Sequence, residues 1–381
     1  MLIRYKTGKN GKPEACAKVY TAAEHGIALE SLDVDAVKVA GRLRRHGYQA
    51  YIVGGAVRDL LMGKIPKDFD MATNASPQQI RKIFRNSRII GKRFRLVHIF
   101  FQQKIIEVTT FRSLESSGFN AVFGSIEEDA KRRDFSLNSL YYDTHEQQIL
   151  DFTGGFEDIK KGIVRPVIPV RRIFSEDPVR MIRAIKYTVK AGFVMQGPLR
   201  RRLKRSASLL ADIPDSRLTE EVFKILLSGN SASILRECAA FGLLPHILPG
   251  LHAQYSQEKN KKIAAQKVFA PLERLDACTE IPDALEKGNA LAYLFANYVY
   301  TQSQLGQRKR IPIGDIYSEM KTWVKPVTPA NKDVDVAAHI IAKKRSEYLE
   351  RGVFSLSGIR PGTDPKKKMP RRRRPRIKRS E

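Results

Sequence analysis

The sequence Tyr51-Ile-Val-Gly-Gly-Ala-Val-Arg-Asp-Leu-Leu61 is the most informative part of this chain of 381 residues. Residues 49–53 are mostly apolar and predict a short buried strand. Gly54 and Gly55 predict a tight turn that leads directly into a helix carrying Arg58. Backbone amides exposed at such a turn can hold phosphate. The alternative is a purely structural turn in which Arg58 pairs with a nearby aspartate.

Two aspartates follow shortly afterwards, in Lys67-Asp-Phe-Asp70. Residues 67–72 predict a second strand, on which Asp68 and Asp70 point to one face while Phe69 points into the core. Mg²⁺ prefers oxygen ligands and commonly takes one or two carboxylates, while water and phosphate oxygens complete its octahedron. The pair therefore predicts a magnesium site, and a solvent-exposed edge strand is the alternative.

Hydrophobic periodicity divides the chain into a mixed α/β part and a helical part. The first 28 residues show no clear periodicity and predict a loose arm. In the mixed part we expect helices around residues 36–43 and 77–84 and a hairpin of residues 96–101 and 104–111. After Asp177 the strand patterns cease, and helices are expected, for example over residues 218–229 and 234–241.

A third polar cluster lies in Arg132-Arg-Asp-Phe-Ser-Leu-Asn138. The i,i+4 spacing of Asp134 and Asn138 predicts that both lie on one face of a helix, with Arg133 beside them. Carboxylate, amide and guanidinium groups placed in this way suit ribose hydroxyls, phosphate and a metal site. An ion-pair network between Arg133 and Asp134 is the alternative.

A fourth polar pair is formed by Asp177 and Arg180. Asp177 precedes Pro178, which is typical of a helix N-cap followed by proline in the first turn. An aspartate acceptor beside an arginine donor also matches the amino group and ring nitrogen of adenine or cytosine, and it does not match uracil or guanine. Capping and base recognition are compatible roles for Asp177.

Taken in order, these four motifs resemble those of the class II nucleotidyltransferases, in the family of poly(A) polymerases and CCA-adding tRNA nucleotidyltransferases. The family motif Gly-Gly-x-Val-Arg-Asp is matched by residues 54–59 and Asp-x-Asp by residues 68–70. Arg-Arg-Asp-x-x-x-Asn is matched by residues 132–138, and Glu-Asp-x-x-Arg by residues 176–180. The similarity is close from residue 37 to residue 183, is looser to about residue 260 and then fades.

The resemblance implies an α+β protein with a polymerase-β-like nucleotidyltransferase head, built from a small mixed sheet with helices, followed by an all-helical neck and body. The expected divisions are a flexible arm (1–28), the head (29–165), a helical neck and RNA-binding domain (166–260), a C-terminal helical region (261–355) and a disordered basic tail (356–381).

The resemblance also implies roles for single residues. Two Mg²⁺ ions are expected at Asp68 and Asp70, with Mn²⁺ as a substitute. The third catalytic carboxylate is expected to be Asp134, as in the family, and Glu107 on the predicted hairpin is the other candidate. ATP is the expected substrate, and the residues expected to bind it are Gly54, Gly55, Arg58, Arg133, Asn138, Asp177 and Arg180.

The choice between the two branches of the family depends on residues 89–98. The stretch Ile89-Ile-Gly-Lys-Arg-Phe-Arg-Leu-Val-His98 resembles the signature of the polyadenylating branch, whereas CCA-adding enzymes carry a Gly-Thr-rich version. RNA-binding side chains are therefore expected at Lys92, Arg93 and Arg95, and in the basic tail at Arg371, Arg372, Arg373 and Arg374.

Composition agrees with a polyanionic partner. Lys and Arg number 68 against 40 Asp and Glu, a formal net charge of +28. Residues 366–379 contribute ten of these cations and no acid, and the remainder still carries +18. RNA is the expected partner, because such an excess suits a phosphate backbone. Three widely spaced cysteines favour neither disulfides nor zinc, and the lack of a long apolar run favours a cytoplasmic location.

The expected reaction is template-independent addition of AMP from ATP to an RNA 3′-hydroxyl, with release of pyrophosphate. A CCA-adding enzyme is the nearest alternative, and a non-catalytic RNA-binding protein on the same fold is the alternative from another class. A dehydrogenase is excluded because no Gly-x-Gly-x-x-Gly follows a first strand. A monomer is expected, and partners from RNA degradation or RNA chaperoning stay open.

Overall fold

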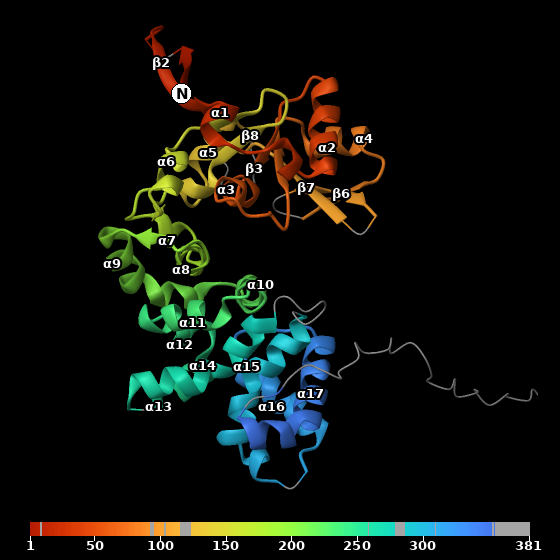
Figure 1. Ribbon diagram of the computed structural model, residues 1–381, viewed down its shortest axis with the longest axis vertical. Coiled ribbons are helices and arrows are strands. Elements are labelled where there is room, and N and C mark those ends of the chain that lie inside the picture. The colour runs from red at the N-terminus through yellow and green to blue at the C-terminus, as the bar shows by residue number, and fades with distance from the viewer. Residues whose placement is uncertain are drawn as a thin grey trace, which may run out of the picture. The chain divides into compact units, whose positions relative to one another are not determined.

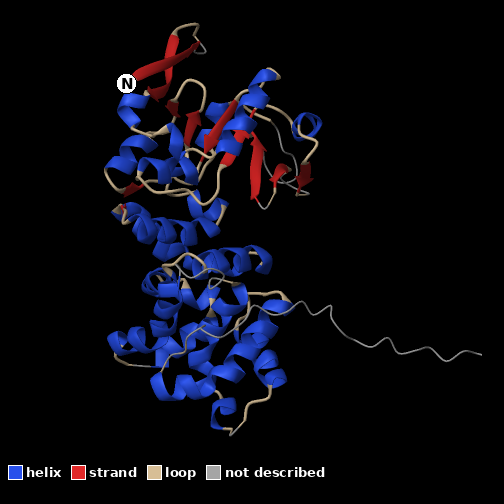
Figure 2. Cartoon of the chain, turned by 45° about the vertical axis from the view of Figure 1, so that its right-hand side comes forward, coloured by secondary structure: helices blue, strands red, loops and turns tan. Residues whose placement is uncertain are grey.

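The chain folds as two compact units, Met1–Asp212 and Ile213–Glu381, called here the N-terminal and the C-terminal unit. The computed structural model describes residues 1–7, 10–91, 95–102, 104–114, 123–257, 259–278, 286–308, 310–352 and 354. Figure 2 shows the strands confined to the N-terminal unit, while the regular elements described in the C-terminal unit are helices. The expected division into an α+β head and a helical body is therefore confirmed.

One large mixed sheet is the frame of the N-terminal unit. Neighbouring strands in it are antiparallel except for β4 and β7, which run parallel. Its free edges among the described residues are β1 and β5. In spatial order the strands are β1 (Leu2–Thr7), β2 (Pro13–Tyr20), β9 (Gln148–Asp151), β8 (Leu140–Asp143), β3 (Ala50–Val53), β4 (Asp70–Thr73), β7 (Lys104–Thr110), β6 (Leu96–Phe101) and β5 (Ser87–Ile90).

The helices of this unit begin and end at residues that physical rules favour. The Asp33 side chain accepts hydrogen bonds from the first backbone amides of α2, and Ser76 followed by Pro77 caps α4. The helices are α1 (Ala22–His25), α2 (Val34–Arg45), α3 (Gly55–Leu61), α4 (Pro77–Ile83), α5 (Ile126–Lys131), α6 (Gly155–Lys160), α7 (Ile173–Glu176), α8 (Val179–Ala191) and α9 (Gly197–Ser206), several of which are labelled in Figure 1.

An aromatic cluster forms the centre of the core beneath the sheet. The rings of Tyr51, Phe111 and Tyr141 lie with their centroids 6.1 to 6.3 Å apart, and all three are buried. They come from β3, from the end of β7 and from β8. Because Tyr51 lies three residues before Gly54, this packing fixes the strand that leads into the glycine turn.

The expectation of a loose arm over residues 1–28 is wrong. Residues of this segment form β1, β2 and α1, and β2 pairs with β9, Tyr20 lying opposite Ile149. The pairing makes a sheet of nine strands among the described residues, larger than the small sheet expected for the head. The sequence has no alternating pattern that predicts this hairpin, because β1 is exposed along its whole length.

The expected boundary between head and neck at residue 165 differs from the compact unit, which extends to Asp212. Helix α8 is joined to the head by short parallel strands, β10 (Ile163–Val164) with β11 (Val194–Met195), which flank it in sequence. Contacts of the head with Arg183 and Tyr187 on α8 add to this connection. The first helices after residue 165 therefore pack with the head.

The C-terminal unit is built around α15, whose residues are buried on nearly all sides. Phe295 of α15 packs edge-on against Trp323, with ring centroids 5.2 Å apart. None of the described helices is both long and apolar enough to span a membrane. The helices are α10 (Asp215–Leu226), α11 (Ser231–Ala240), α12 (Leu244–Ile247), α13 (Pro249–Gln257), α14 (Lys261–Ala277), α15 (Lys287–Thr301), α16 (Ile313–Trp323) and α17 (Asn331–Arg351).

Candidate active site

The glycine turn lies where β3 passes into α3, as expected. Gly54 has φ of 71°, a conformation that disfavours residues with a side chain. A Cβ added at Gly54 would lie 3.4 Å from Nη1 of Arg133, and one at Gly55 would lie 3.6 Å from Nη2 of Arg58. The turn is therefore held close between two guanidinium groups, which suits a phosphate site.

The two aspartates lie beside this turn. Asp70 begins β4 and is paired with Val53, the residue before Gly54. Asp68 and Asp70 are exposed, while Phe69 between them is buried. The alternation expected from the spacing is confirmed, although the strand begins only at Asp70 and not at residue 67.

Glu107 reaches the same part of the sheet through strand pairing. β4 and β7 are parallel, with Met71 beside Val108, and this register places Glu107 beside Asp70 and on the same face. The Glu107 side chain is 39% exposed, and its Oε2 lies 3.6 Å from Nε2 of His98 on β6. Glu107 is thus an accessible carboxylate next to the aspartate pair.

Asp134 lies in a different environment. It is buried, its Oδ1 accepts a hydrogen bond from the Phe135 amide, and its Oδ2 lies 2.8 Å from Nε of Arg183 on α8. The expectation that Asp134 and Asn138 share a helix is wrong. Helix α5 ends at Lys131, Phe135 is extended and buried, and a separate 3₁₀ turn follows at Ser136–Asn138.

The donor set fits hard divalent cations. Asp68 and Asp70 offer exposed carboxylate oxygens, with Glu107 beside them in the sheet, and Mg²⁺ needs only one or two such ligands when water and phosphate complete its shell. In the part of the chain that the structure describes, no three His, Cys, Asp or Glu side chains converge closely enough to hold a metal by themselves.

Arg58 and Asn138 form one side of the site. Nη1 of Arg58 donates to Oδ1 of Asn138 at 2.8 Å, while its Nε and Nη2 donate to Asp59. The guanidinium also lies over the ring of Tyr187, 5.2 Å from its centroid. The structural pairing of Arg58 with a neighbouring aspartate is therefore present, and the interaction with Asn138 brings two of the expected nucleotide-binding residues together.

Arg133 is the centre of a buried network behind the turn. Its Nε donates to the Tyr141 hydroxyl, its Nη1 to the Asn138 carbonyl and its Nη2 to Oδ2 of Asp129. Burial alone would lower the pKa of Arg133, but Tyr141 and Asp129 outweigh it and raise that pKa above its usual value. The ion pair of Arg133 is thus with Asp129, and not with Asp134 as the alternative interpretation had it.

Asp177 and Arg180 lie at the junction of α7 and α8. Oδ1 of Asp177 accepts a hydrogen bond from the amide of Val179, the first residue of α8, at 3.3 Å, whereas Pro178 itself holds the N-cap position. Nη1 of Arg180 donates to the Ile173 carbonyl and to Oε2 of Glu176, both at 3.2 Å. These bonds fix the Arg180 guanidinium against α7.

Several residues of this site were missed by sequence reasoning. Asp129 precedes Arg133 by four residues, a helical spacing that was available as a signal. Arg183 and Tyr187 on α8 reach the head only through tertiary packing, which no local pattern reveals. Of the expected RNA-binding residues, Arg95 is described and exposed, while Lys92, Arg93, Arg371, Arg372, Arg373 and Arg374 lie outside the described residues.

Family models and known proteins agree with this geometry. Residues 50–165 match the model for the poly(A) polymerase head domain, and residues 192–255 match the one described as a probable RNA and SrmB-binding site of polymerase A. Poly(A) polymerase I of Salmonella typhi is 40% identical over 263 residues, covering 65% of this chain and 56% of that protein. The Haemophilus influenzae protein of that name is 39% identical over 299 residues, covering 74% and 65%.

CCA-adding enzymes are similar as well. The enzyme of Leuconostoc mesenteroides is 35% identical over 345 residues, covering 87% of this chain and 79% of that protein. Among solved structures, the Bacillus stearothermophilus CCA-adding enzyme in complex with CTP has a TM-score of 0.52 at 27% identity, covering 83% of this chain and 96% of that chain. The Thermotoga maritima enzyme complexed with tRNA, at 18% identity and a TM-score of 0.56, shows the shared fold; the match covers 87% of this chain and 86% of that one.

Fold and site together define a nucleotidyltransferase with a mixed-sheet head and a helical body. The chain belongs to the family of poly(A) polymerases and CCA-adding tRNA nucleotidyltransferases. It spans just over half of the length of the Salmonella poly(A) polymerase I that it matches.

Proposed function

We propose that this protein adds adenylate residues to RNA 3′ ends without a template, using ATP and releasing pyrophosphate. The observation that carries this proposal is the exposed pair Asp68 and Asp70 beside the Gly54 turn, in a chain that is 39 to 40% identical to poly(A) polymerase I proteins. The CCA-adding relatives are 34 to 35% identical. The polyadenylating reading is therefore the better supported of the two.

Asp68 and Asp70 are proposed to hold two Mg²⁺ ions, with Mn²⁺ as a substitute. When bound, such ions lower the pKa of an attacking hydroxyl and stabilise the charge on a leaving pyrophosphate. Because Asp134 is occupied by Arg183 and buried, we favour Glu107 as the additional carboxylate, and assign Asp134 a role in fixing α8 against the head.

The remaining residues position the substrates. Backbone amides of Gly54 and Gly55 with the guanidinium of Arg58 would bind the triphosphate, and Asn138, which Arg58 and Arg133 hold in place, would contact the ribose. In the proposed reaction the RNA 3′-hydroxyl attacks the α-phosphate in line with the leaving pyrophosphate. The phosphoryl site would contribute by positioning these groups and by compensating their charge.

Base selection is assigned to Asp177 and Arg180. The carboxylate would accept from the exocyclic amino group and the guanidinium would donate to the adjacent ring nitrogen, a pattern that adenine and cytosine share. This pair thus excludes uracil and guanine, and the size of the surrounding pocket has to separate adenine from cytosine.

RNA is the proposed polymeric substrate, and the cytoplasm, where RNA and ATP meet, is the proposed location. The stretch that matches the RNA-binding family model includes α9, which presents exposed Arg201 and Arg205. The name of that model also mentions SrmB, so a protein partner docking within residues 192–255 is part of the proposal.

The decisive experiment compares two RNAs. Purified protein is incubated with labelled oligo(A), and separately with tRNA that lacks its last three nucleotides, in the presence of ATP, CTP or both. Long ladders on oligo(A) with ATP alone are expected. Three discrete additions restricted to tRNA and dependent on CTP would instead assign the CCA-adding reaction, and no addition to either RNA would leave only RNA binding.

A further inference from the structure

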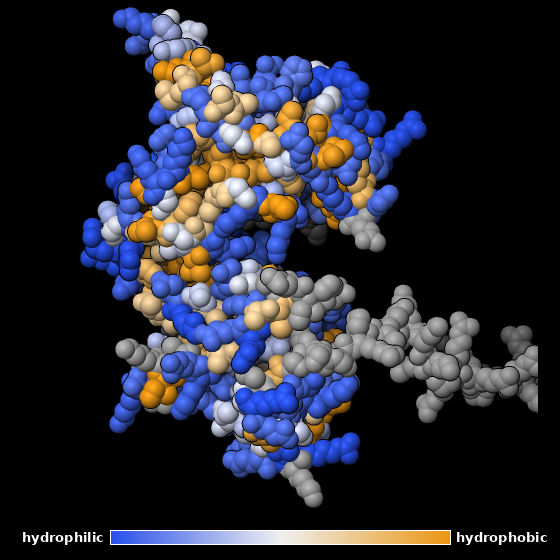
Figure 3. All heavy atoms as spheres, viewed as in Figure 1, coloured by the Kyte–Doolittle hydropathy of each residue, from blue (hydrophilic) through white to orange (hydrophobic). Residues whose placement is uncertain are grey.

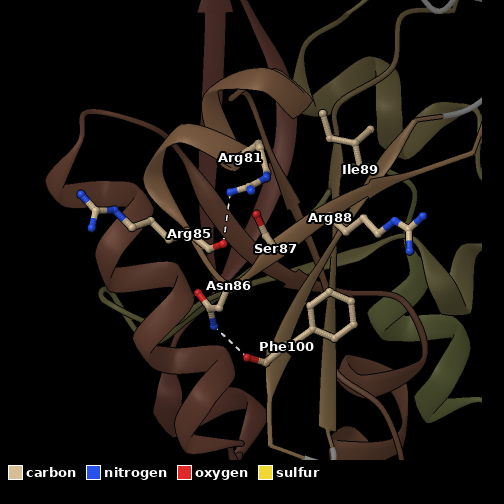
Figure 4. A pocket seen from close by; sticks show the side chains of 7 residues that line it. All are labelled: Arg81, Arg85, Asn86, Ser87, Arg88, Ile89 and Phe100. Carbon is tan, nitrogen blue, oxygen red and sulfur yellow. Dashed lines mark hydrogen bonds between the residues drawn. The ribbon is translucent and has the colours of Figure 1, made fainter.

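A second polar region lies at the free edge of the large sheet, away from the glycine turn. An open hollow of about 680 Å³ is formed there by the end of α4 and by β5 and β6. Its lining includes Arg81, Arg85, Asn86, Arg88 and Phe100, and no Asp or Glu is among the described residues that line it. Figure 4 shows the arginine side chains spread around the hollow, with the Phe100 ring standing beside Arg88.

Hydrogen bonds hold part of the lining of the hollow in place, while other side chains of the lining stay accessible. Nη1 of Arg81 donates to the carbonyls of Phe84 and Arg85, at 3.3 and 3.1 Å. The Asn86 side-chain amide donates to the Phe100 carbonyl at 2.7 Å, which ties β5 to β6 beneath the ring. Phe100 is 41% exposed, so an aromatic side chain is accessible at the edge of the hollow.

Strand register connects this hollow with the aspartate pair. Arg88 of β5 is paired with His98 of β6, His98 is paired with Glu107 of β7, and the parallel register places Glu107 beside Asp70. Directly paired residues point to the same face of a sheet. One row of polar side chains thus runs from Asp70 to Arg88, while the residues next in sequence, such as Val97 and Val108, are buried on the other face.

The row covers three strand-to-strand steps, or ~14 Å at ~4.8 Å per step. We propose that the hollow binds single-stranded RNA a few nucleotides upstream of the extended 3′ end. One base would stack on Phe100, and the neighbouring phosphates would be bound by Arg85 and Arg88. This inference rests on the proposed function, because it is that function which brings an RNA 3′ end to Asp70.

The chemistry of the hollow favours RNA over a protein partner. An exposed aromatic ring beside guanidinium groups is how single strands are bound without regard to sequence, since every base has a face that stacks. An acidic peptide would use the arginines but would leave the ring without a matching surface. A free triphosphate would not stack on the Phe100 ring and would not extend along the polar row toward Asp70.

The test measures binding of labelled oligo(A) in the absence of ATP, with one RNA too short to span the row and one several times longer. The wild-type protein is expected to bind the longer RNA more tightly. In the Arg85→Ala/Arg88→Ala variant that affinity should fall about ten-fold, and the slope of log K against log salt should decrease by about 1.4, because each lost phosphate contact removes about 0.7. Binding of the short RNA should not change.

A second variant separates stacking from charge. Phe100→Leu keeps an apolar side chain but removes the ring, and about ten-fold weaker binding of the longer RNA with an unchanged salt slope is expected, with recovery in Phe100→Tyr. The matched control, Lys12→Ala/Lys161→Ala, removes two exposed cations elsewhere on the N-terminal unit. Its affinity for the longer RNA should fall far less than in the Arg85→Ala/Arg88→Ala variant.

Wild-type affinity in both hollow variants, with unchanged circular dichroism, would overturn the inference. Loss of binding to a poly-glutamate peptide without loss of RNA binding would overturn it in favour of a protein-docking surface. Adenylate addition to the short RNA is measured in parallel. Its absence in the wild-type protein would refute the proposed function separately, because the binding experiment uses no nucleotide.

Discussion

Asp68 and Asp70 are exposed carboxylates next to a buried phenylalanine, so replacing them removes charge without removing core packing. We expect Asp68→Asn and Asp70→Asn each to reduce adenylate addition by at least ~100-fold, because an amide is a poor magnesium ligand. Primer extension with Mg²⁺ measures the loss, and circular dichroism checks the fold. More than a few per cent of residual activity in both variants would show that neither carboxylate holds the ions.

Arg133 is expected to behave differently, because its bonds go to protein groups behind the turn. Removing it leaves the Asp129 carboxylate buried without its cation, and Arg133→Met should lower the free energy of unfolding by about 3 kcal/mol. Lys131→Met, which removes an exposed cation two residues away, should cost less than about 1 kcal/mol. Urea unfolding followed by circular dichroism measures the free energy of unfolding of both variants. Equal decreases in the two variants would refute the structural role of Arg133.

At the scale of residues, spacing within one motif was a good guide. The two-residue interval from Asp68 to Asp70 and the glycine pair at Gly54 predicted their geometry, because strand alternation and positive φ are local properties. The partner of Asp134 was not predictable, since Arg183 approaches from α8 through tertiary packing. The arginines of the hollow were likewise unpredicted, because they come from separate elements.

At the scale of elements, Tyr20 on β2 illustrates how the hairpin is attached. Its ring stacks on Phe156 of α6 at a centroid distance of 3.8 Å. No described residue forms a hydrogen bond with its buried hydroxyl. Burial, with Asp151 and Glu157 nearby, raises the pKa of Tyr20 to about 12. The folded state therefore favours the neutral phenol.

The sign of the pH effect follows from this. Because the folded pKa lies above the unfolded value of about 10, the stabilisation is complete below pH ~10 and is lost as the pH rises toward 12. At pH 8 the free energy of unfolding of Tyr20→Phe should be within about 1 kcal/mol of the wild-type value. Between pH 9 and 12 the wild type should lose about 2 kcal/mol more of its free energy of unfolding than the variant does. Urea midpoints across this range test it, and identical alkaline losses in the two proteins would contradict it.

Elements were predicted well where the pattern was local. The helix with buried Ala36, Val39, Ala40 and Leu43 is α2, and the hairpin turn at Gln102 has the expected position between β6 and β7. The N-terminal hairpin was missed because β1 has no buried face to leave a pattern. The helix expected to carry Asp134 and Asn138 was also wrong, since burial of Phe135 overrides the helical spacing.

At the scale of the whole molecule, charge is the dominant property. The net charge of +28 is distributed over the chain, and Figure 3 shows hydrophilic side chains covering most of the visible surface of each unit. Residues 366–379 contribute ten cations from outside the described residues. If about half of these meet phosphates, they account for about 3 to 4 units of the salt slope of RNA binding.

This contribution can be measured without changing the length of the chain. Replacing the ten cations of residues 366–379 by glutamine should flatten the slope of log K against log salt by about 3 to 4 units for any RNA sequence. In the control variant, the same number of serine and proline residues outside that segment are replaced by glutamine, so that the charge stays unchanged. An unaltered slope would mean that the segment has another partner than RNA.

The position of β2 in the sheet has a consequence for synthesis. β2 leaves the ribosome well before its neighbour β9, in which Ile149 pairs with Tyr20, because six strands, β3 to β8, and helices α1 to α5 lie between them in the sequence. Contacts between segments so distant in sequence form late and slowly. Until then Val19 and Tyr20, which are buried in the folded protein, stay in solvent, and synthesis that stalls before β9 should yield an aggregation-prone product.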